Sequence, residues 1–244
     1  MNASITLATA SRVLRQLRHD RRTLAMLVVV PCVLLSLLAW IFDGTDVFDE
    51  IGAPLLGIFP FVVMFLVTSV ATLRERTSGT LERLLTMPIG KLDLLVGYAL
   101  AFGLVATVQA VVATGLSVTL LGLDVAGPLW LLLVVAVCDA VLGMALGLFL
   151  SAFAATEFQA VQFMPAFVLP QFLLCGLLVP RDQLDDVLRW ISSLLPLSYA
   201  VDLMRDLTTN EEVDPSAWLD LSVVVLAILL ALGLGAATLR RRTP

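Results

Sequence analysis

Charged side chains are scarce in this chain of 244 residues. Asp, Glu, Lys and Arg make up 14% of it, whereas soluble domains contain about 25%. Hydrophobic residues make up 59%, and the mean hydropathy is +0.99, so a water-soluble core is excluded. The composition therefore predicts an integral membrane protein.

Histidine and cysteine are also rare, which leaves few ligands for a metal ion. His19 is the only histidine, and the three cysteines have no CxxC or related metal-binding spacing. We therefore expect no metal site and no disulfide framework. The cysteines are interpreted as small apolar packing residues inside hydrophobic segments. They are Cys32, Cys138 and Cys175.

Motifs for catalysis and ATP binding are missing too. A P-loop needs the pattern GxxxxGK[ST], but the only Gly-Lys pair, Gly90-Lys91, is followed by Leu92. No paired carboxylates or Ser-His-Asp set lies at membrane depth. We therefore expect no catalytic residues and no cofactor bound by this chain. Energy for any transport must come from a partner or from an ion gradient.

Six long hydrophobic runs are what the chain does contain. The shortest has 19 residues, which at about 1.5 Å per residue covers roughly 28 Å, close to the ~30 Å hydrocarbon core of a bilayer. Each run is therefore long enough to cross a membrane as a helix. The runs comprise residues 24–42, 51–73, 94–121, 128–153, 161–179 and 219–239.

The basic residues orient these runs. Threading six spans back and forth puts twelve of the fifteen Lys and Arg residues on one side. Cytoplasmic loops are enriched in Lys and Arg, so we expect that side, with both chain ends, in the cytosol. No odd number of spans keeps this bias. The predicted fold for residues 1–244 is therefore one all-α membrane domain with six transmembrane helices.

The segment 180–218 is predicted to be external, because it carries eight Asp and Glu residues but only three Arg. Apolar residues recur at helical spacing from Leu184 to Leu195, which predicts an amphipathic helix ended by Pro196. A second short helix is expected over residues 198–207. Both are too short to span, so we expect them to dip into the outer leaflet and return.

The segment 3–22 is predicted to be an amphipathic helix on the cytosolic membrane surface. The alternative is a merely solvated basic leader. The net charge of −5 does not favour a nucleic-acid partner, since the acidic excess is external and the cytosolic side is basic. The residues that define this helix are Arg12, Arg15, Leu17 and Arg18.

The segment 74–93 joins the second and third runs in the cytosol. Ser78 or Gly79 is suited to cap a short helix, with Glu82 placed to bind the free amides of its first turn, and Pro88 stops it. Three leucines make one apolar stripe on this charged helix, which requires either a protein partner or the membrane surface. They are Leu81, Leu84 and Leu85.

One charged residue falls inside a span. Asp139 lies near the middle of the fourth run, where a charged Asp costs about 2.5 to 3.5 kcal/mol, so it should face protein or water. It is interpreted either as a contact for a cationic substrate or a proton, or as a neutral packing residue. Gly143 and Gly147 form a GxxxG pattern nearby. Candidate residues along a substrate path are Asp139, Gln109, Gln162 and Gln171.

A resemblance to a known family rests on two strings. The first is Glu75-Arg76-Thr77-Ser78-Gly79-Thr80-Leu81-Glu82-Arg83-Leu84-Leu85-Thr86-Met87-Pro88, which follows two spans. The second runs from Pro165 to Pro196 and combines an interrupted fifth span, an amphipathic external helix and Pro196-Leu197-Ser198-Tyr199. Both resemble the ABC-2 type transporter permease family, and the similarity to its drug-resistance branch, with daunorubicin-type exporters, is the tighter one.

The resemblance implies a membrane subunit of an ATP-driven exporter for a drug or lipid-like substrate. Its partners would be two ATP-binding cassette ATPase subunits, which hold ATP and Mg, a second copy of this permease or a paralogue, and membrane lipids. Residues 3–22 would form the interface helix and 74–93 the coupling segment. The coupling residues would be Glu75, Arg76, Ser78, Gly79, Thr80, Leu81, Glu82, Leu84 and Leu85.

Other readings of the sequence stay open at this point. Family members also export lipid-linked polysaccharides, and the fold alone does not name the substrate. An ion-coupled secondary transporter is a further alternative, although such proteins are expected to show repeated halves and broken, charged helices at the midplane. We expect a multi-pass protein of a bacterial inner or plasma membrane with both termini in the cytoplasm.

Overall fold

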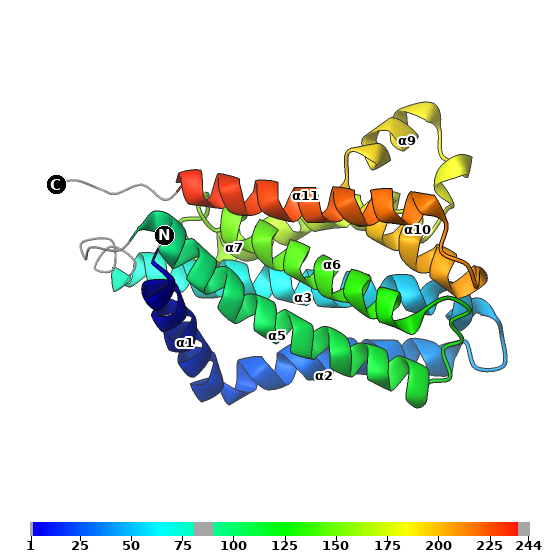
Figure 1. The fold of residues 1–244 in the computed structure, drawn as a ribbon, viewed down its shortest axis with the longest axis horizontal. Coiled ribbons are helices and arrows are strands. Elements are labelled where there is room, and N and C mark those ends of the chain that lie inside the picture. Colours follow the sequence, from blue (N-terminus) through cyan, green and yellow to red (C-terminus); the bar gives the residue numbers. More distant parts are fainter. Residues whose placement is uncertain (1, 81–89, 239–244) are drawn as a thin grey trace.

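Helices form all of the regular structure in residues 2–80 and 90–238, which are the residues that the computed structural model describes. Most of them run roughly along the long axis of the molecule (Figure 1). In chain order they are α1 (Ala3–His19), α2 (Arg21–Ile41), α3 (Val47–Thr77), α5 (Lys91–Thr119), α6 (Leu129–Leu150), α7 (Glu157–Phe163), the π-helix η1 (Met164–Val168), α8 (Leu169–Leu174), the 3-10 turn η2 (Arg181–Gln183), α9 (Asp186–Ser193), α10 (Pro196–Thr209) and α11 (Pro215–Thr238).

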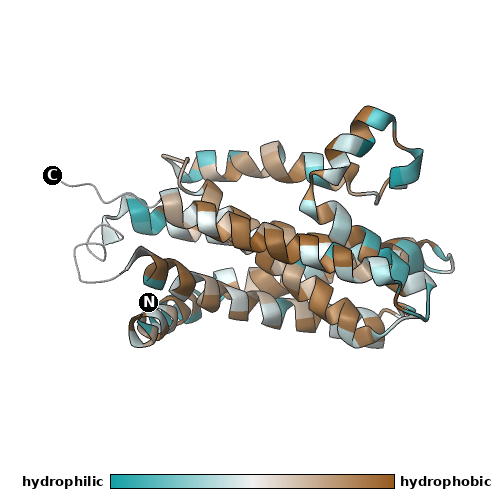
Figure 2. Ribbon diagram, turned by 45° about the horizontal axis from the view of Figure 1, so that its top comes forward, coloured by the Kyte–Doolittle hydropathy of each residue, from teal (hydrophilic) through white to brown (hydrophobic). Residues whose placement is uncertain are grey.

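Five of these helices are long and apolar enough to cross a membrane: α2, α3, α5, α6 and α11. Each covers one of the predicted hydrophobic runs, with ends that differ by a few residues. The all-helical membrane class is therefore confirmed. Figure 2 shows the apolar residues along the middle of the helices and polar residues gathered towards the ends of the molecule.

The fifth hydrophobic run is not one regular helix. Residues 157–174 are helical but divide into α7, η1 and α8, and each piece is too short to span a membrane by itself. Pro165 lies in the π-helical turn and Pro170 in α8, where each removes a backbone N–H donor. The helix ends before Gly176, whose φ of 93° lies in the left-handed region that favours glycine, and the chain bends there.

Helices α3 and α6 form the centre of the bundle. The apolar windows of α3 and α6 are 61% and 67% buried, against 17% for α2 and 22% for α11, which lie outside. A Cβ atom at Gly143 would lie 2.2 Å from the carbonyl oxygen of Phe61, and one at Gly147 would lie 2.5 Å from that of Phe65. The GxxxG pattern is therefore a close contact between the two central helices.

The connection between α8 and α11 contains the two helices that the sequence predicts there. Asp185 caps α9, since its Oδ1 accepts from the backbone N–H of Val187 at 3.1 Å. Pro196 does more than end that region, because it also opens α10. Helix α10 buries Leu197 and Met204 against α3 and α6, so it belongs to the core, whereas α9 exposes Trp190.

Different helices lie at the two ends of the long axis of the molecule. Figure 1 places α1, the end of α3, the start of α5 and the end of α11 at one end of the long axis. Helix α9 and the connection from α10 to α11 lie at the other end.

Candidate functional site at the junction of α1, α3 and α5

Helix α3 is longer than a membrane crossing requires. Its 31 residues span about 46 Å, against a hydrocarbon core of ~30 Å. Its last turns carry Arg74, Glu75 and Arg76, and the chain then turns at Gly79, whose φ is 71°. The N–H of Ser78 donates to the carbonyl of Arg74 at 2.9 Å, which closes the helix. Charged side chains therefore gather at this end of α3.

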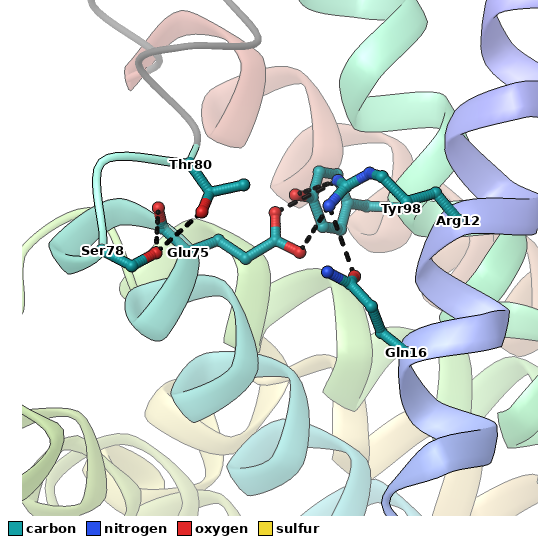
Figure 3. A network of polar contacts seen from close by, with 6 residues as sticks. All are labelled: Arg12, Gln16, Glu75, Ser78, Thr80 and Tyr98. Atoms are coloured by element: carbon teal, nitrogen blue, oxygen red, sulfur yellow. Dashed lines mark hydrogen bonds and ion pairs between the residues drawn. The ribbon is translucent and has the colours of Figure 1, made fainter.

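Glu75 is bound by a side chain from the N-terminal helix. Nη1 of Arg12 lies 3.0 Å from Oε1 of Glu75, and Nη2 lies 3.2 Å from Oε2. Nη2 also donates to the hydroxyl of Tyr98 on α5 at 2.9 Å. Figure 3 shows the three side chains meeting from three helices. The side chains of Arg12 and Glu75 are 26% and 15% exposed, so this pair is better shielded than a surface ion pair.

Helix α1 packs on α5 rather than leaving its apolar side to the membrane. Ala10, Val13 and Leu17 are buried, together with residues of α5, in one hydrophobic cluster. Gly97 of α5 permits this approach, since a Cβ there would lie 2.6 Å from the Cβ of Thr9. At the start of α1, the backbone N–H of Asn2 donates to Oδ1 of Asp93 at 2.8 Å. Helix α1 is therefore joined to α5 along its length.

The turn from α1 into α2 is held by one acidic residue. Asp20 accepts from the backbone N–H of Thr23 at 3.1 Å and from its hydroxyl at 2.6 Å. These hydrogen bonds, of which the one from the hydroxyl is the stronger influence, lower the pKa of the Asp20 carboxyl. The cap makes α2 begin at Arg21, three residues before the predicted start of the first hydrophobic run.

A second ion pair joins the same end of α3 to the fifth helical run. Nε and Nη2 of Arg74 lie 2.8 and 3.1 Å from the two carboxylate oxygens of Glu157, in the first turn of α7. This pair is half exposed, so water screens it more than the Arg12–Glu75 pair. The end of α3 is thus tied to α1 through Glu75 and to α7 through Arg74, while Arg12 also binds α5.

A cavity of about 190 Å³ lies between α1, α3 and α5. Leu17, Arg74, Glu75, Tyr98 and Phe102 are among the residues that line it. Because apolar packing is incomplete there, the Arg12–Glu75 ion pair carries much of the connection between α1 and α3, and the hydrogen bond from Arg12 to Tyr98 adds a polar contact between α1 and α5. The junction is therefore joined by a few directional polar contacts.

A protein-family model matches most of this chain. The family model described as "ABC-2 type transporter" matches residues 5–208, which include α1, the junction and the helices up to α10. The chain belongs to the ABC-2 type transporter family. The resemblance inferred from the two sequence strings is therefore confirmed at the level of the family.

Curated proteins with similar sequences carry names of the same kind. "Probable multidrug ABC transporter permease YbhR" of Escherichia coli is 26% identical over 63% of this chain. "Probable multidrug ABC transporter permease YbhS" of the same organism is 23% identical over 74% of this chain. "ABC transporter G family member 20" of Dictyostelium discoideum is 26% identical over 65% of the chain. The matched regions cover 42%, 48% and 22% of these relatives, respectively, so the chain spans less than half of each.

The residues expected to couple this ABC-2 chain to a partner divide into two groups. Glu75 and Arg76 lie in the last turn of α3, and Ser78 and Gly79 form the turn after it. Thr80 follows this turn, and its hydroxyl lies 3.0 Å from that of Ser78. Ser78 and Gly79 thus end α3. Four further residues, and the predicted helix that they form, lie outside the described residues. They are Leu81, Glu82, Leu84 and Leu85.

The expected interface-helix residues take different positions on α1. Arg12 faces the junction and Leu17 is buried, whereas Arg15 and Arg18 are exposed. Sequence reasoning missed the partners of Arg12 and Arg74. Tyr98 and Glu157 lie 86 and 83 residues away from them, and no local pattern connects these positions.

The expected substrate-path residues are not in one environment. Asp139 and Gln109 are buried, and their side-chain polar atoms have no hydrogen-bond partner among the described residues. Gln171 is buried on α8, where its amide nitrogen donates to the carbonyl of Phe167 at 3.1 Å. Gln162 is exposed on α7. A shared path would therefore have to involve a different arrangement of these helices.

Proposed function

We propose that this chain is the permease subunit of an ATP-driven ABC exporter. Membership in the ABC-2 type transporter family supports the class, and the names of the bacterial relatives support a multidrug or other amphipathic substrate, as in the drug-resistance branch. Export of a hydrophobic or amphipathic drug or lipid out of the cytoplasm or the inner leaflet is the activity we assign.

The observation that carries the mechanism is the polar junction at the end of α3. Glu75 binds Arg12 of α1, Arg12 also binds Tyr98 of α5, and Arg74 binds Glu157 of α7, immediately before the segment assigned to coupling. A force applied to that segment would reach three other helices through these contacts. It would also reach α6 directly, because Gly143 and Gly147 hold α6 against the backbone of α3.

The proposal includes partners that this chain needs. Two ATPase subunits would bind and hydrolyse ATP with Mg, and a second copy of this permease or a paralogue would complete the membrane part. The residues of the coupling segment that contact the ATPase would be Ser78 to Thr80 together with Leu81, Glu82, Leu84 and Leu85. Membrane lipids would surround the exposed faces of α2 and α11.

The proposed topology has six crossings with both termini in the cytoplasm of a bacterial inner membrane. Helices α7, η1 and α8 together would make the fifth crossing, since their 18 residues cover roughly 27 Å. Arg74–Glu157 lies at one end of this run, and at the other end Ser192 donates to the carbonyl of Leu174 at 2.7 Å. The broken run would thus link the cytosolic junction to α9.

The experiment that tests this function is reconstitution. We expect the affinity-tagged chain to co-purify with an ATPase subunit that carries Walker A and B motifs. In proteoliposomes the complex should show ATP-dependent movement of a lipophilic dye and substrate-stimulated ATP hydrolysis. Movement driven by an ion gradient without ATP would instead support a secondary transporter and overturn the proposal.

A further inference from the structure

Asp139 occupies an unusual position in the bundle. It lies on α6, has 0% of its surface exposed, and neither carboxylate oxygen has a hydrogen-bond partner among the described residues. The ion pairs found in the described part of the chain do not include it. An isolated carboxylate in such a place would be strongly unfavourable, and a buried group of this kind takes up a proton instead.

The space for this carboxyl is made by a glycine and closed by a methionine. A Cβ atom on Gly57 of α3 would lie 2.8 Å from Oδ2 of Asp139 and 3.0 Å from Sδ of Met204. Met204 is itself fully buried and comes from α10. Three elements therefore enclose Asp139: its own helix α6, the glycine face of α3, and α10 as the cover.

The helices packed against Asp139 do not supply a basic side chain that would neutralise its carboxylate. Residues 51–73 of α3 contain no titratable side chain, and α5 presents only Tyr98 beyond its first turn. The nearby basic groups of the covering region are engaged elsewhere: Arg181 pairs with Asp202, and Nη1 of Arg205 donates to the carbonyl of Gly176 at 3.0 Å. Further titratable groups on the surrounding elements are Cys138, Cys175, Tyr199, Asp206 and Asp220.

We propose that Asp139 is a proton-binding site, which holds a proton while α10 covers it and releases that proton to water when α10 moves away from α3 and α6. The O–H bond of the carboxyl breaks on release and water accepts the proton. The site is distinct from the junction at the cytosolic end of α3, and the proposal does not depend on an ATPase partner.

The direction of the pH effect follows from linkage. The covered arrangement binds one more proton at Asp139 than an open arrangement in which the carboxylate is hydrated. Acid conditions therefore favour the covered arrangement, and a rise in pH favours opening. Burial also raises the pKa of Asp202 and of Asp206 on α10, although Arg181 opposes the shift at Asp202. A test must therefore separate Asp139 from these neighbours.

Infrared spectroscopy tests the proton directly on the full chain in lipid nanodiscs. At pH 7 we expect a carbonyl stretching band of a protonated carboxyl that shifts on ¹³C-aspartate labelling and disappears in Asp139→Asn. The exposed Asp43→Asn is the matched control and should keep the band. If the labelled wild-type chain shows no such band, Asp139 is ionised and the proposal is wrong, whatever the variant does.

Thiol labelling tests the link to α10. In a chain with alanine at the three native cysteine positions, Met204→Cys is labelled with a maleimide across a pH series, with Asp139 or with Asp139→Asn. The labelling rate with Asp139 is divided by the rate with Asp139→Asn. This ratio cancels the pH dependence that comes from the thiol and from Asp202 and Asp206, because both chains contain these groups. We expect this ratio to rise with pH by up to about tenfold per unit above the ordinary Asp pKa of ~3.9.

The exposed position Val187→Cys, on α9, provides the matched control, and its rate ratio should not depend on pH. A flat ratio at position 204 would overturn the link between the proton and α10. Both measurements use the permease alone, so their failure is distinguishable from a failure of the proposed ATP-driven transport.

Discussion

Arg74 and Glu75 are adjacent in the chain but form ion pairs with different helices. Arg74 binds Glu157 of α7 with a shortest distance of 2.8 Å, and Glu75 binds Arg12 of α1 with a shortest distance of 3.0 Å. The end of α3 is thereby held between the N-terminal helix and the broken fifth run. Any displacement of this end of α3 must either carry these helices along or break the pairs.

The first prediction concerns the shielded pair. Glu75→Gln should lower the free energy of unfolding by only about 1 kcal/mol, because the pair is partly solvated. It should nevertheless uncouple ATP hydrolysis from transport, since Arg12 loses its charged partner. The measurement is the ratio of transport to ATPase rate in proteoliposomes. Arg15→Gln, a change at an exposed position of α1, the helix that carries Arg12, is the control. An unchanged ratio in Glu75→Gln would show that the pair does not transmit motion.

The second prediction concerns the contact between the central helices. Gly143→Ala places a methyl group 2.2 Å from the carbonyl oxygen of Phe61, so α6 and α3 must separate. We expect a loss of roughly 1 to 3 kcal/mol in stability, measured by denaturant unfolding in detergent. Gly103→Ala on α5 has no atom within 4 Å and should leave stability nearly unchanged or raise it slightly. Equal effects of the two changes would contradict the close contact.

The third prediction tests the leucines assigned to the coupling segment, which lie outside the described residues. Changing Leu81 and Leu85 together to Ser should leave insertion intact but weaken ATPase binding, since each buried Leu contributes about 1.5 to 3 kcal/mol. Co-purification measures the effect. The same change at Leu178 and Leu194, which are exposed at the opposite end of the molecule, is the control. Retention of the ATPase at wild-type stoichiometry with substrate-stimulated hydrolysis would refute the assignment.

The fourth prediction concerns topology. In a chain without its native cysteines, Ser78→Cys should be protected from an impermeant maleimide in intact cells, whereas Asp185→Cys should react. Both positions are exposed, so accessibility across the membrane alone distinguishes them. Arg241 should behave like Ser78, and Glu212 like Asp185. Labelling of position 78 from outside would rule out six crossings with a cytosolic coupling segment.

Proline illustrates where reasoning from the sequence reaches its limit. Pro54 and Pro60 lie inside α3, and Pro31 inside α2, without ending these helices. Pro165, in contrast, lies in a π-helical turn that divides the fifth run. The same residue type has both outcomes because neighbouring helices and local rearrangements compensate the lost hydrogen bond to different degrees. Pro165, Pro170 and Gly176 predicted an interruption of the run at residues 161–179, but not that it takes the form of a π-helical turn between two short α-helices.

The membrane class, the approximate ends of five long helices and the two short helices before α11 could all be predicted from the amino-acid sequence. These features depend on hydrophobicity, helical period and capping, which are local properties of the chain. The sequence also identified Gly143, Gly147 and Asp139 as residues inside a span. Three features depend on the packing of the helices instead: Arg12 binds Glu75, α1 lies on α5, and Asp139 and Met204 both lie against Gly57. Arg12 and Glu75 lie 63 positions apart in the chain, and Thr9 and Gly97 lie 88 positions apart. Such contacts depend on how the helices pack around α3 and α6, which no local sequence pattern specifies.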